Sequence, residues 1–508
     1  MIRVNTKQRS AARKLDRRKR RLARRCGREG RDCPPTPVLD TRATRYDVSE
    51  RDLGTNAAGV AAIHKVATYL HLDEEINRHV PLLKVHLPYH ESDHVLTMAY
   101  NLMAGGTRLQ DLELRRTDEA FMNMLGASRL PDPTTEGDFL RRFTAPVIVD
   151  MLMDGINAAR VRAWEVSPHL RDAEAIIDVD GSIAPTDGEK KEGVDIAYNG
   201  IWGYHPLFVT LANTNEELFI LNRSGNRPSH EGSVPYIDKS IELCRPYFRS
   251  IMVRGDSDFA LTKNFDRWSN AGVKFVFSFD TTKNLIEHAQ ALPNGAWARL
   301  ERNRRQPAGE PRTTRDNEKE ARVIARGFEN ITLESESVAE FTYRPDACAR
   351  DYRVVALRKV LVVKKGQAVL YPDIRYFFYI TNDMTAPKEE IVFLSNGRCN
   401  QENVIEQMKN GVNAMRVPVY DLVSNWAYMV IAALAWNLKA WFALLQVRAQ
   451  DATTLLAMEF RTFINYVILV PAQVIRKAHQ VVVRIIGYTP GVRMLFSPLR
   501  RIGRHARL

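Results

Sequence analysis

Apolar residues recur at helical spacing through much of the first third of the chain. Leu96, Tyr100 and Met103 fall on one face of a helix, and Gly105 ends the run. The same pattern of apolar and polar positions extends over residues 56–165. It predicts that residues 56–165 are largely helical.

Short apolar runs bounded by turn residues replace this pattern after residue 170. A helix is predicted at residues 235–247, between the third and fourth of these runs. Three strands, a helix, and two further strands separated by a helix are typical of an α/β domain with a mixed sheet. The predicted strands are residues 175–181, 205–211, 218–221, 250–256 and 274–279.

A second β-rich stretch follows the α/β pattern. Residues 301–322 are highly charged, and strand-like runs come after them at residues 352–357, 360–363 and 375–381. We interpret this stretch as an insertion within the α/β domain. From about residue 386 the chain returns to helical spacing.

The most apolar segment of the chain is residues 422–438, which hold 17 residues without a formal charge. A membrane span needs about 20 predominantly apolar residues. Polar side chains such as Asn425 and Asn437 interrupt this segment, and Lys439 closes it. We expect a buried core helix here and no association with a membrane.

Positive charge is concentrated at the two ends of the chain. The net charge is +13, with +12 in residues 1–31 and +8 in residues 476–508, so the residues between carry −7. Basic arms of this density usually bind polyanions. We expect residues 1–35 to stay disordered until they meet a phosphate backbone. The residues expected to contact DNA are Arg17, Arg18, Lys19, Arg20 and Arg21.

Three acids occupy positions suited to metal binding. Asp180 ends the first predicted strand of the α/β region and Asp256 ends the fourth. Ligands of α/β sheets bind at the carboxyl ends of strands. Glu402 lies in a later predicted helix. Carboxylates are preferred ligands of Mg²⁺, and two such ions about 3.5–4 Å apart can support phosphodiester chemistry.

Helical spacing places two cations beside Glu402. Steps of 4 and 11 residues bring Arg398, Glu402 and Lys409 to nearly the same angle on a helix. One helical stripe would then present a carboxylate between two basic side chains. We expect Arg398 and Lys409 to contact DNA phosphates outside the metal site.

Two neighbouring acids leave the assignment of the ligands open. Asp178 and Asp258 each lie two residues from a candidate ligand, so in a strand each would share its neighbour's face. A single Asp at a strand end is also more often a turn or cap residue than a ligand. These residues alone do not choose between Asp178 and Asp180.

At these residues the chain resembles the DDE transposases of bacterial insertion sequences, in the branch with a Y-R-E-K signature. The most similar group is group 1 of the insertion-sequence family thirteen-eighty, and the resemblance covers roughly residues 55–490. The segments that carry it are Asp178-Val179-Asp180-Gly181-Ser182, Gly203-Tyr204-His205-Pro206-Leu207, Arg223-Ser224-Gly225-Asn226, Arg254-Gly255-Asp256-Ser257-Asp258-Phe259 and the helix with Arg398, Glu402 and Lys409.

The resemblance implies an RNase H-like α/β core with a mixed sheet, and it assigns two divalent ions, Mg²⁺ or Mn²⁺, to Asp180, Asp256 and Glu402. It also implies terminal inverted repeats and target DNA as partners, a homodimer on DNA, and a bacterial cytoplasm with association to the nucleoid. The parts of the chain are then a basic disordered arm (1–35), a helical DNA-binding region (36–165), the first part of the core (166–280), the β-rich insertion (281–390), and a second part of the core with the glutamate helix and a basic C-terminal tail (391–508).

One position departs from the signature. The Tyr of Y-R-E-K should lie three residues before Arg398, where this chain has Ser395. The phosphate contact of that Tyr is therefore missing or replaced.

These observations predict a transposase that cuts DNA at the ends of an element and joins the freed 3′-OH to target DNA. Two other functions stay open. One is a DNA-binding relic of a transposase without catalysis, which metal-dependent nicking would distinguish. The other is a metal-dependent nuclease without strand transfer, which a joining assay would distinguish.

A metalloprotease pattern is also present in the helical region. The segment from His90 to His94 fits H-E-x-x-H, whose chemistry needs both histidines on one face within a helix. Pro88 precedes the motif, and Ser92 with Asp93 predicts a helix start that leaves His90 outside the helix. We therefore expect no protease site here.

Overall fold

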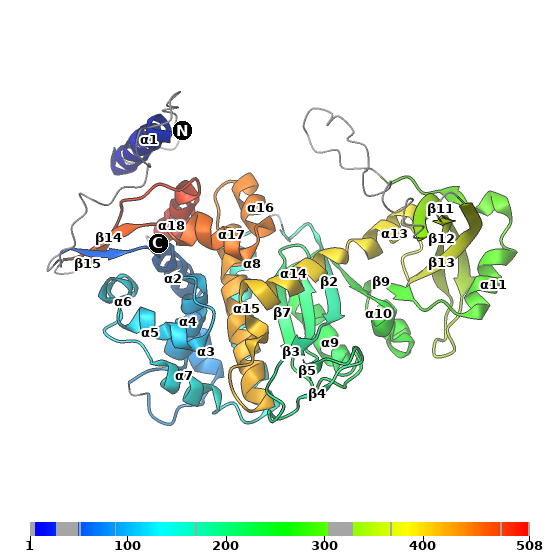
Figure 1. The fold of residues 1–508 in the computed structure, drawn as a ribbon, viewed down its shortest axis with the longest axis horizontal. Helices are drawn as coiled ribbons and strands as arrows, with labels where there is room; N and C mark the ends of the chain where they lie inside the picture. The colour runs from blue at the N-terminus through cyan, green and yellow to red at the C-terminus, as the bar shows by residue number, and fades with distance from the viewer. Residues whose placement is uncertain are drawn as a thin grey trace. The chain divides into compact units, whose positions relative to one another are not determined.

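The computed structural model describes residues 6–26, 49, 52–86, 88–167, 170–302, 329–365, 368–477 and 480–505. The chain forms two compact units (Figure 1). Unit 1 comprises Met1–Val166 with Gln407–Leu508, and unit 2 comprises Ser167–Glu406. We had expected residues 391–508 to complete the α/β core. This expectation is wrong beyond Glu406, because the chain there returns to unit 1, where its long apolar helix packs on the N-terminal helices.

Unit 2 is built on one nine-stranded sheet, with strand order β10-β11-β12-β13-β9-β8-β2-β6-β7. The five strands predicted for the α/β region are all present. Their bounds are β2 (Glu174–Gly181), β6 (Leu207–Leu211), β7 (Glu216–Leu221), β8 (Ser250–Gly255) and β9 (Lys274–Phe279). β2, β6 and β7 pair in antiparallel fashion, whereas β8 and β9 run parallel to β2.

The interior of this sheet is apolar because alternate residues of its strands face the core. Ala175, Ile177 and Val179 of β2 are all fully buried. Parallel neighbours need a crossover segment between them, and helices supply it here. The helices of unit 2 are α9 (Ser233–Cys244), α10 (Phe265–Asn270), α11 (Lys283–Ala291), α13 (Lys388–Asn396) and α14 (Cys399–Glu406).

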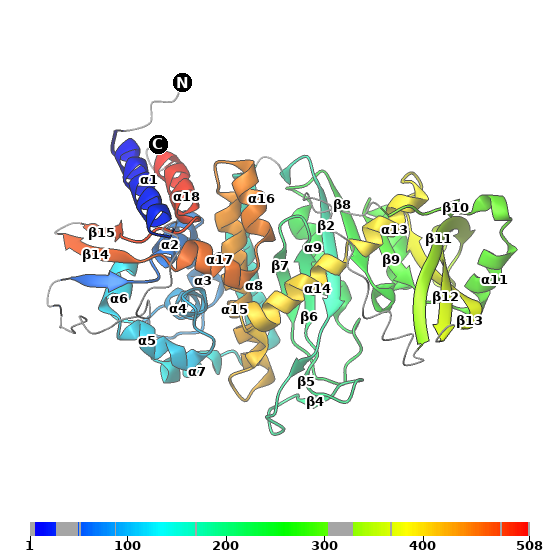
Figure 2. The same ribbon diagram turned by 45° about the horizontal axis from the view of Figure 1, so that its top comes forward.

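The β-rich insertion extends the same sheet (Figures 1 and 2). Its long strands pair in antiparallel order, and β13 pairs with β9 of the α/β part, which places Phe378 opposite Phe279. The two runs predicted at 352–357 and 360–363 are one strand, β12. The bounds are β10 (Ala298–Arg299), β11 (Glu329–Tyr343), β12 (Tyr352–Lys365) and β13 (Ala368–Thr381).

A shared core joins the insertion to the α/β part. Met252 of β8, Val276 of β9, Leu357 of β12 and Ile391 of α13 belong to one buried apolar cluster. The insertion therefore continues the sheet and the core of the α/β part. A small separate sheet is formed by β3 (Ala184–Pro185), β5 (Trp202–Tyr204) and β4 (Asp195–Ile196).

Unit 1 is mainly helical and surrounds one long apolar helix, α15 (Leu422–Leu444), which contacts α2, α4 and α8. Among the described residues α15 alone is long and apolar enough to cross a membrane, and 94% of its most apolar stretch is buried. The prediction of a core helix is confirmed. The other helices are α2 (Gly59–Tyr69), α3 (Leu72–His79), α4 (Glu91–Met103), α5 (Glu113–Arg116), α6 (Glu119–Leu125), α7 (Pro133–Leu140), α8 (Pro146–Glu165), α16 (Ala449–Ala457), α17 (Phe460–Phe463) and α18 (Val492–His505).

The basic N-terminal arm is helical over α1 (Thr6–Cys26), so the predicted disorder is wrong for these residues. Its Ala, Arg, Lys and Leu residues favour a helix. Leu15 also packs in a small apolar core with Val470 and Val492. That core lies at a three-stranded sheet of β1 (Leu53–Thr55), β14 (Ala472–Lys477) and β15 (Gln480–Ile485). The rest of the expected arm, residues 1–5 and 27–35, lies outside the described residues.

Candidate active site

Two of the predicted metal ligands lie at the ends of adjacent parallel strands. β2 and β8 pair in parallel, and Val179 opposite Gly255 is their last paired position. Asp180 is the residue after Val179, and Asp256 is the residue after Gly255. The register therefore brings both carboxylates to the same edge of the sheet. Asp256 also caps the short helical turn Ser257–Phe259 by accepting a backbone N–H at 3.1 Å.

Asp178 belongs to a structural ion pair. Nε and Nη2 of Arg254 donate to its two carboxylate oxygens, each at 2.7 Å, and both side chains are almost fully buried. Nη1 of Arg254 donates to the backbone oxygen of Leu394 at 2.7 Å, which ties α13 to the sheet. Because Arg254 occupies both oxygens of Asp178, Asp180 is the β2 carboxylate that interacts with Asp256.

Arg398 lies at Asp180. Its Nη1 donates a hydrogen bond to Oδ2 of Asp180 at 2.8 Å, and both side chains are 17% exposed. We had expected Arg398 to hold DNA phosphates outside the metal site. In this structure its guanidinium instead supplies the positive charge beside the carboxylates. A cation that binds Asp180 through Oδ2 would have to take over this position.

The electrostatic setting of the two carboxylates favours a cation between them. The pKa of Asp180 is raised to about 6; burial is the largest cause, Arg398 acts to lower the pKa, and the neighbouring charge of Asp256 acts to raise it. Burial also raises the pKa of Asp256, with Asp258 acting in the same direction. Two acids that resist ionisation together either hold a proton or bind a positive charge. Asp258 thus contributes charge to the site while remaining exposed.

Glu402 lies on α14, one turn beyond Arg398, and is exposed. The helix is fixed to the sheet by Gln401, whose Nε2 donates to the backbone oxygen of Phe208 at 3.3 Å. The carboxylate of Glu402 forms no ion pair or hydrogen bond within the described part of the chain. The structure therefore brings Asp180 and Asp256 together and leaves Glu402 free at the surface of α14.

The predicted stripe of Arg398, Glu402 and Lys409 is not one α-helix. Arg398 lies in the turn before α14, and the α-helix ends at Glu406. Lys409 lies in a π-helical turn, Gln407–Gly411, which belongs to unit 1. The even helical spacing that we used for Lys409 does not hold across this change, and π turns of this kind are frequent at functional sites.

Ser395 occupies the place of the signature Tyr. It lies on α13, is 6% exposed, and its backbone oxygen accepts the N–H of Arg398 at 3.1 Å. A side chain buried in this way does not reach a phosphate in solvent.

The chain matches the family described as transposase DDE domain group 1 over residues 45–507. It belongs to this family. DDE transposases generally use divalent metal ions. A solved structure with some likeness is a cryo-EM structure of the piggyBac transposase synaptic complex with hairpin DNA; it is 11% identical, has a TM-score of 0.36, and the match covers 82% of this chain and 84% of that chain. No curated protein matches the chain.

Two polar side chains, His205 and Arg223, lie beside Gly181, the residue after Asp180, in this DDE transposase. Neither was among the site residues predicted from the sequence. A Cβ built on Gly181 would lie 2.8 Å from Nε2 of His205 and 3.5 Å from Nη2 of Arg223. Nδ1 of His205 lies 2.8 Å from the backbone oxygen of Arg227, and burial lowers the pKa of His205. A donated N–H there leaves Nε2 as an acceptor facing Gly181.

Arg223 holds the loop of residues 228–231 through hydrogen bonds to its backbone. Its Nε donates to the backbone oxygen of His205 at 2.8 Å, and its Nη1 donates to the backbone oxygens of Pro228, Ser229 and Glu231 at 2.7–3.0 Å. Burial lowers its pKa to about 10. Its Nη2 has no hydrogen-bond partner in the described part of the chain. The G-Y-H-P and R-S-G-N segments of the resemblance contained the signal for these two residues.

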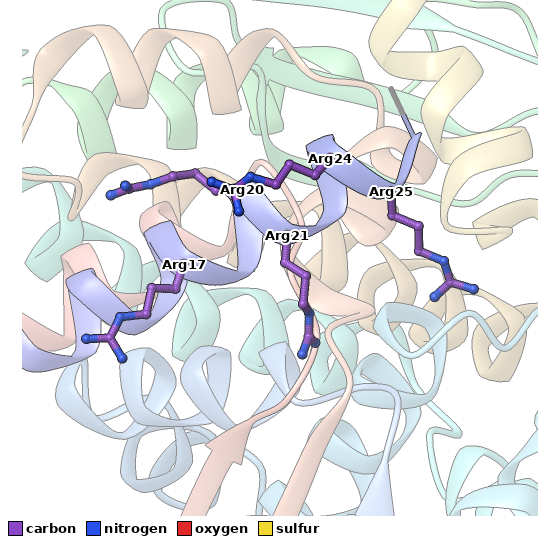
Figure 3. A pocket seen from close by; sticks show the side chains of 5 residues that line it. All are labelled: Arg17, Arg20, Arg21, Arg24 and Arg25. Atoms are coloured by element: carbon purple, nitrogen blue, oxygen red, sulfur yellow. The ribbon is translucent and has the colours of Figure 1, made fainter. Parts of the chain in front are cut away.

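The five predicted DNA-contacting residues of the basic N-terminal arm lie on α1. Arg17, Arg20 and Arg21 line a cavity of about 580 Å³ together with Arg24 and Arg25, which we had not singled out (Figure 3). Arg24 and Arg25 follow Arg20 and Arg21 at a spacing of four residues, which on a helix places them on the same face, so the sequence held the information needed to include them. The remaining two predicted residues, Arg18 and Lys19, do not line it. Nη1 of Arg18 donates to the backbone oxygen of Ile485 at 2.7 Å, and Lys19 is exposed.

Within the described part of the basic C-terminal tail, β15 precedes α18, and α18 carries structural contacts. Arg493 pairs with Asp16 of α1, and Arg501 donates to the backbone oxygen of Val166. Part of the tail's charge therefore stabilises unit 1.

The two histidines of the H-E-x-x-H segment lie in different settings. α4 begins at Glu91, so His90 precedes the helix. His94 is buried and pairs with Glu136 at 3.0 Å. The two histidines therefore do not share a solvent-facing helical surface.

Proposed function

We propose that this protein is an insertion-sequence transposase that cuts DNA at the ends of its element and transfers the freed 3′ ends to target DNA. Asp180, Asp256 and Glu402 are its proposed catalytic ligands for two divalent ions, Mg²⁺ or Mn²⁺. The observation that carries the proposal is the pair of carboxylates at the ends of β2 and β8, in a chain of the transposase DDE family. The insertion-sequence branch rests on the sequence motifs.

The strand arrangement supports an RNase H-like core. Three antiparallel strands (β2, β6, β7) are followed along the chain by two strands (β8, β9) that run parallel to β2 on its other side. This order makes β2 and β8 neighbours in the interior of the sheet, so their ends lie next to each other. Carboxylates on two rigid strands keep their separation during catalysis, which a metal site needs.

The residues at this edge fit divalent cations. Asp180 and Asp256 offer hard oxygen ligands, and their burial and mutual repulsion make a cation favourable there. When bound, such ions would supply an activated water and stabilise charge on the leaving oxygen. Glu402 would complete the set from α14, whose start is held at Asp180 by Arg398. Arg398 and Lys409 would hold the phosphate backbone once Arg398 has left Asp180.

DNA binding is assigned to the basic surfaces of unit 1. The arginines of α1 line one cavity and have no acid among them, so they suit a phosphate backbone. We assign contact with terminal inverted repeats to this surface and to the helical region of residues 36–165. Joining two ends in one reaction further implies a dimer on DNA.

Cleavage and joining of labelled element ends test this proposal. Asp256→Ala should abolish both reactions while it keeps end binding. Asp280→Ala is the matched control, because Asp280 also follows a parallel strand, β9, and is exposed. Full cleavage by Asp256→Ala would reject the site, and cleavage without joining by the parent protein would identify a nuclease instead.

A further inference from the structure

Three metal-ligating side chains meet in unit 1, at the start of α4. His86 lies in the loop between α3 and α4, His90 directly precedes α4, and Glu91 is its first residue. One ligand atom of each lies within 4.8 Å of the others. Two of the three belong to the H-E-x-x-H segment, whose second histidine is engaged elsewhere with Glu136.

One spacing in the cluster, that between His86 and Glu91, suits a small cation with tetrahedral coordination, and the other two are within 4.8 Å. Nε2 of His86 and Oε2 of Glu91 are 3.4 Å apart. Bonds of about 2.0–2.1 Å from zinc to nitrogen or oxygen require ligand atoms roughly 3.3–3.5 Å apart in a tetrahedron. The rings of His86 and His90 have centroids 4.7 Å apart and are tilted by 38°, so they are close without lying flat on each other.

Glu91 is held as a ligand would be. Its side chain is 1% exposed, and Oε1 accepts the backbone N–H groups of Leu82 at 3.1 Å and Leu83 at 2.8 Å. Its other oxygen, Oε2, is buried without a hydrogen-bond donor in the described part of the chain. A buried carboxylate oxygen in this state is stabilised by a nearby positive charge, which either a protonated His86 at 3.4 Å or a bound metal ion supplies. Oε2 lies on the side of His86, which is exposed and open to ions from solvent.

The backbone at the start of α4, which carries His90 and Glu91, is held in place by hydrogen bonds and by packing. The N–H of His90 donates to Oδ2 of Asp93 at 2.9 Å, and the N–H of Ser92 donates to Oδ1 of Asn77 at 2.9 Å. Almost every residue of α4 is buried. His90 and Glu91 therefore keep fixed positions, and only His86 comes from a loop.

We propose that His86, His90 and Glu91 bind a divalent transition-metal ion, with Zn²⁺ as the best fit. Two imidazoles and one carboxylate suit zinc and not Mg²⁺, and they leave a fourth position to solvent. The site is distinct from Asp180 and Asp256, which belong to unit 2. The bound ion fixes the loop before α4 to the helix.

The test uses the full-length chain without a histidine tag and with Asp180→Ala and Asp256→Ala, so that the other acids bind no metal. Titration with Co²⁺, followed by its visible absorption, should show one ion in a nitrogen and oxygen site that Zn²⁺ displaces. His86→Ala and His90→Ala should each weaken binding by at least about 100-fold. Because His86 is 48% exposed, its loss should not prevent folding, and circular dichroism checks this.

His71→Ala is the matched control. His71 is also exposed and lies 3.2 Å from a single carboxylate, Glu74. Co²⁺ binding should be unchanged in this variant. Absence of Co²⁺ binding in the parent chain, or binding by His86→Ala as tight as in the parent, would overturn the proposal. The readout is metal binding alone, so the result does not depend on DNA cleavage.

Discussion

Nη1 of Arg398 donates a hydrogen bond to Oδ2 of Asp180 at 2.8 Å, across 218 positions of sequence. The guanidinium lies beside two carboxylates whose pKa values are both raised by burial. It therefore stabilises the carboxylates in the absence of another cation. The same contact positions the start of α14, and with it Glu402.

Metal affinity should depend on pH near the pKa of Asp180. A carboxylate binds a metal ion only after it loses its proton. With a pKa of about 6, Asp180 becomes protonated as the pH falls through that value, so Mn²⁺ affinity should fall there as well. Arg398→Gln removes a charge that lowers this pKa, so the fall should begin at a higher pH. Calorimetric titration of Mn²⁺ at a series of pH values measures both midpoints.

Arg398→Lys serves as the control for the charge of Arg398. It keeps the positive charge but not the guanidinium, so its midpoint should lie close to that of the parent protein. A midpoint for Arg398→Gln at or below the parent value would contradict the assigned electrostatics.

Asp178→Asn should destabilise unit 2. The substitution leaves the charge of Arg254 buried without its ionic partner, a loss of about 3–5 kcal/mol. Asp351→Asn breaks a pair with Arg344 of the same 2.7 Å length, but both side chains are at least half exposed, so it should cost less than about 1 kcal/mol. Thermal unfolding of the full chain compares them. Equal effects would show that the buried pair has no special role.

Lys439→Met should stabilise unit 1 at neutral pH. Burial on α15 lowers the pKa of Lys439 to about 7, although Nζ donates to the backbone oxygen of Leu456 at 3.0 Å. The unfolded chain, with a lysine pKa of about 10.4, binds more protons than the folded chain between about pH 7 and 10. The free energy of unfolding of the parent protein should therefore rise with pH over this window. Below about pH 7 Lys439 is charged in the folded chain, and its full destabilising effect is present.

Removing the charge should raise stability at pH 7 by roughly 1–3 kcal/mol and flatten its pH dependence. Lys283→Met, at a side chain 92% exposed, is the control and should leave stability nearly unchanged. Differential scanning calorimetry at two pH values gives the comparison. A lower melting temperature for Lys439→Met would contradict the prediction.

The arginines of α1 should set nonspecific DNA affinity. Arg20→Gln with Arg24→Gln should weaken binding to all DNA sequences alike, and reduce the slope of log affinity against log salt by up to about 2. Arg13→Gln with Lys14→Gln removes the same charge from exposed positions of α1 that do not line the cavity. Fluorescence anisotropy at several salt concentrations should show the larger change in the first pair. Equal changes would mean that only net charge matters.

The sequence predicted the strands of the α/β region because their apolar runs are short and bounded by turn residues. It could not choose between Asp178 and Asp180, since both lie on one face of β2. The choice depends on Arg254, which pairs with Asp178 only because of the register between β2 and β8. Register between strands 76 positions apart has no local signal in the sequence.

Composition was misleading in two places. The charge of residues 1–35 predicted disorder, but Leu15 gives α1 an apolar contact in unit 1. Lys439 marked the end of an apolar run, yet α15 continues to Leu444 with this lysine buried inside. In both cases tertiary contacts outweigh the local pattern, and only the folded chain reveals them.

The dependence of cleavage on the metal ion supplied, in a variant of Asp256, tests the central claim most directly. Asp256→Cys replaces a hard oxygen ligand by a soft thiolate, which binds Mg²⁺ poorly and Mn²⁺ or Cd²⁺ better. If Asp256 is a catalytic ligand, this variant should fail to cut element ends in Mg²⁺ and regain cleavage in Mn²⁺ or Cd²⁺, while Asp280→Cys cuts in all three. Cleavage by Asp256→Cys in Mg²⁺ at the parent rate would contradict the account.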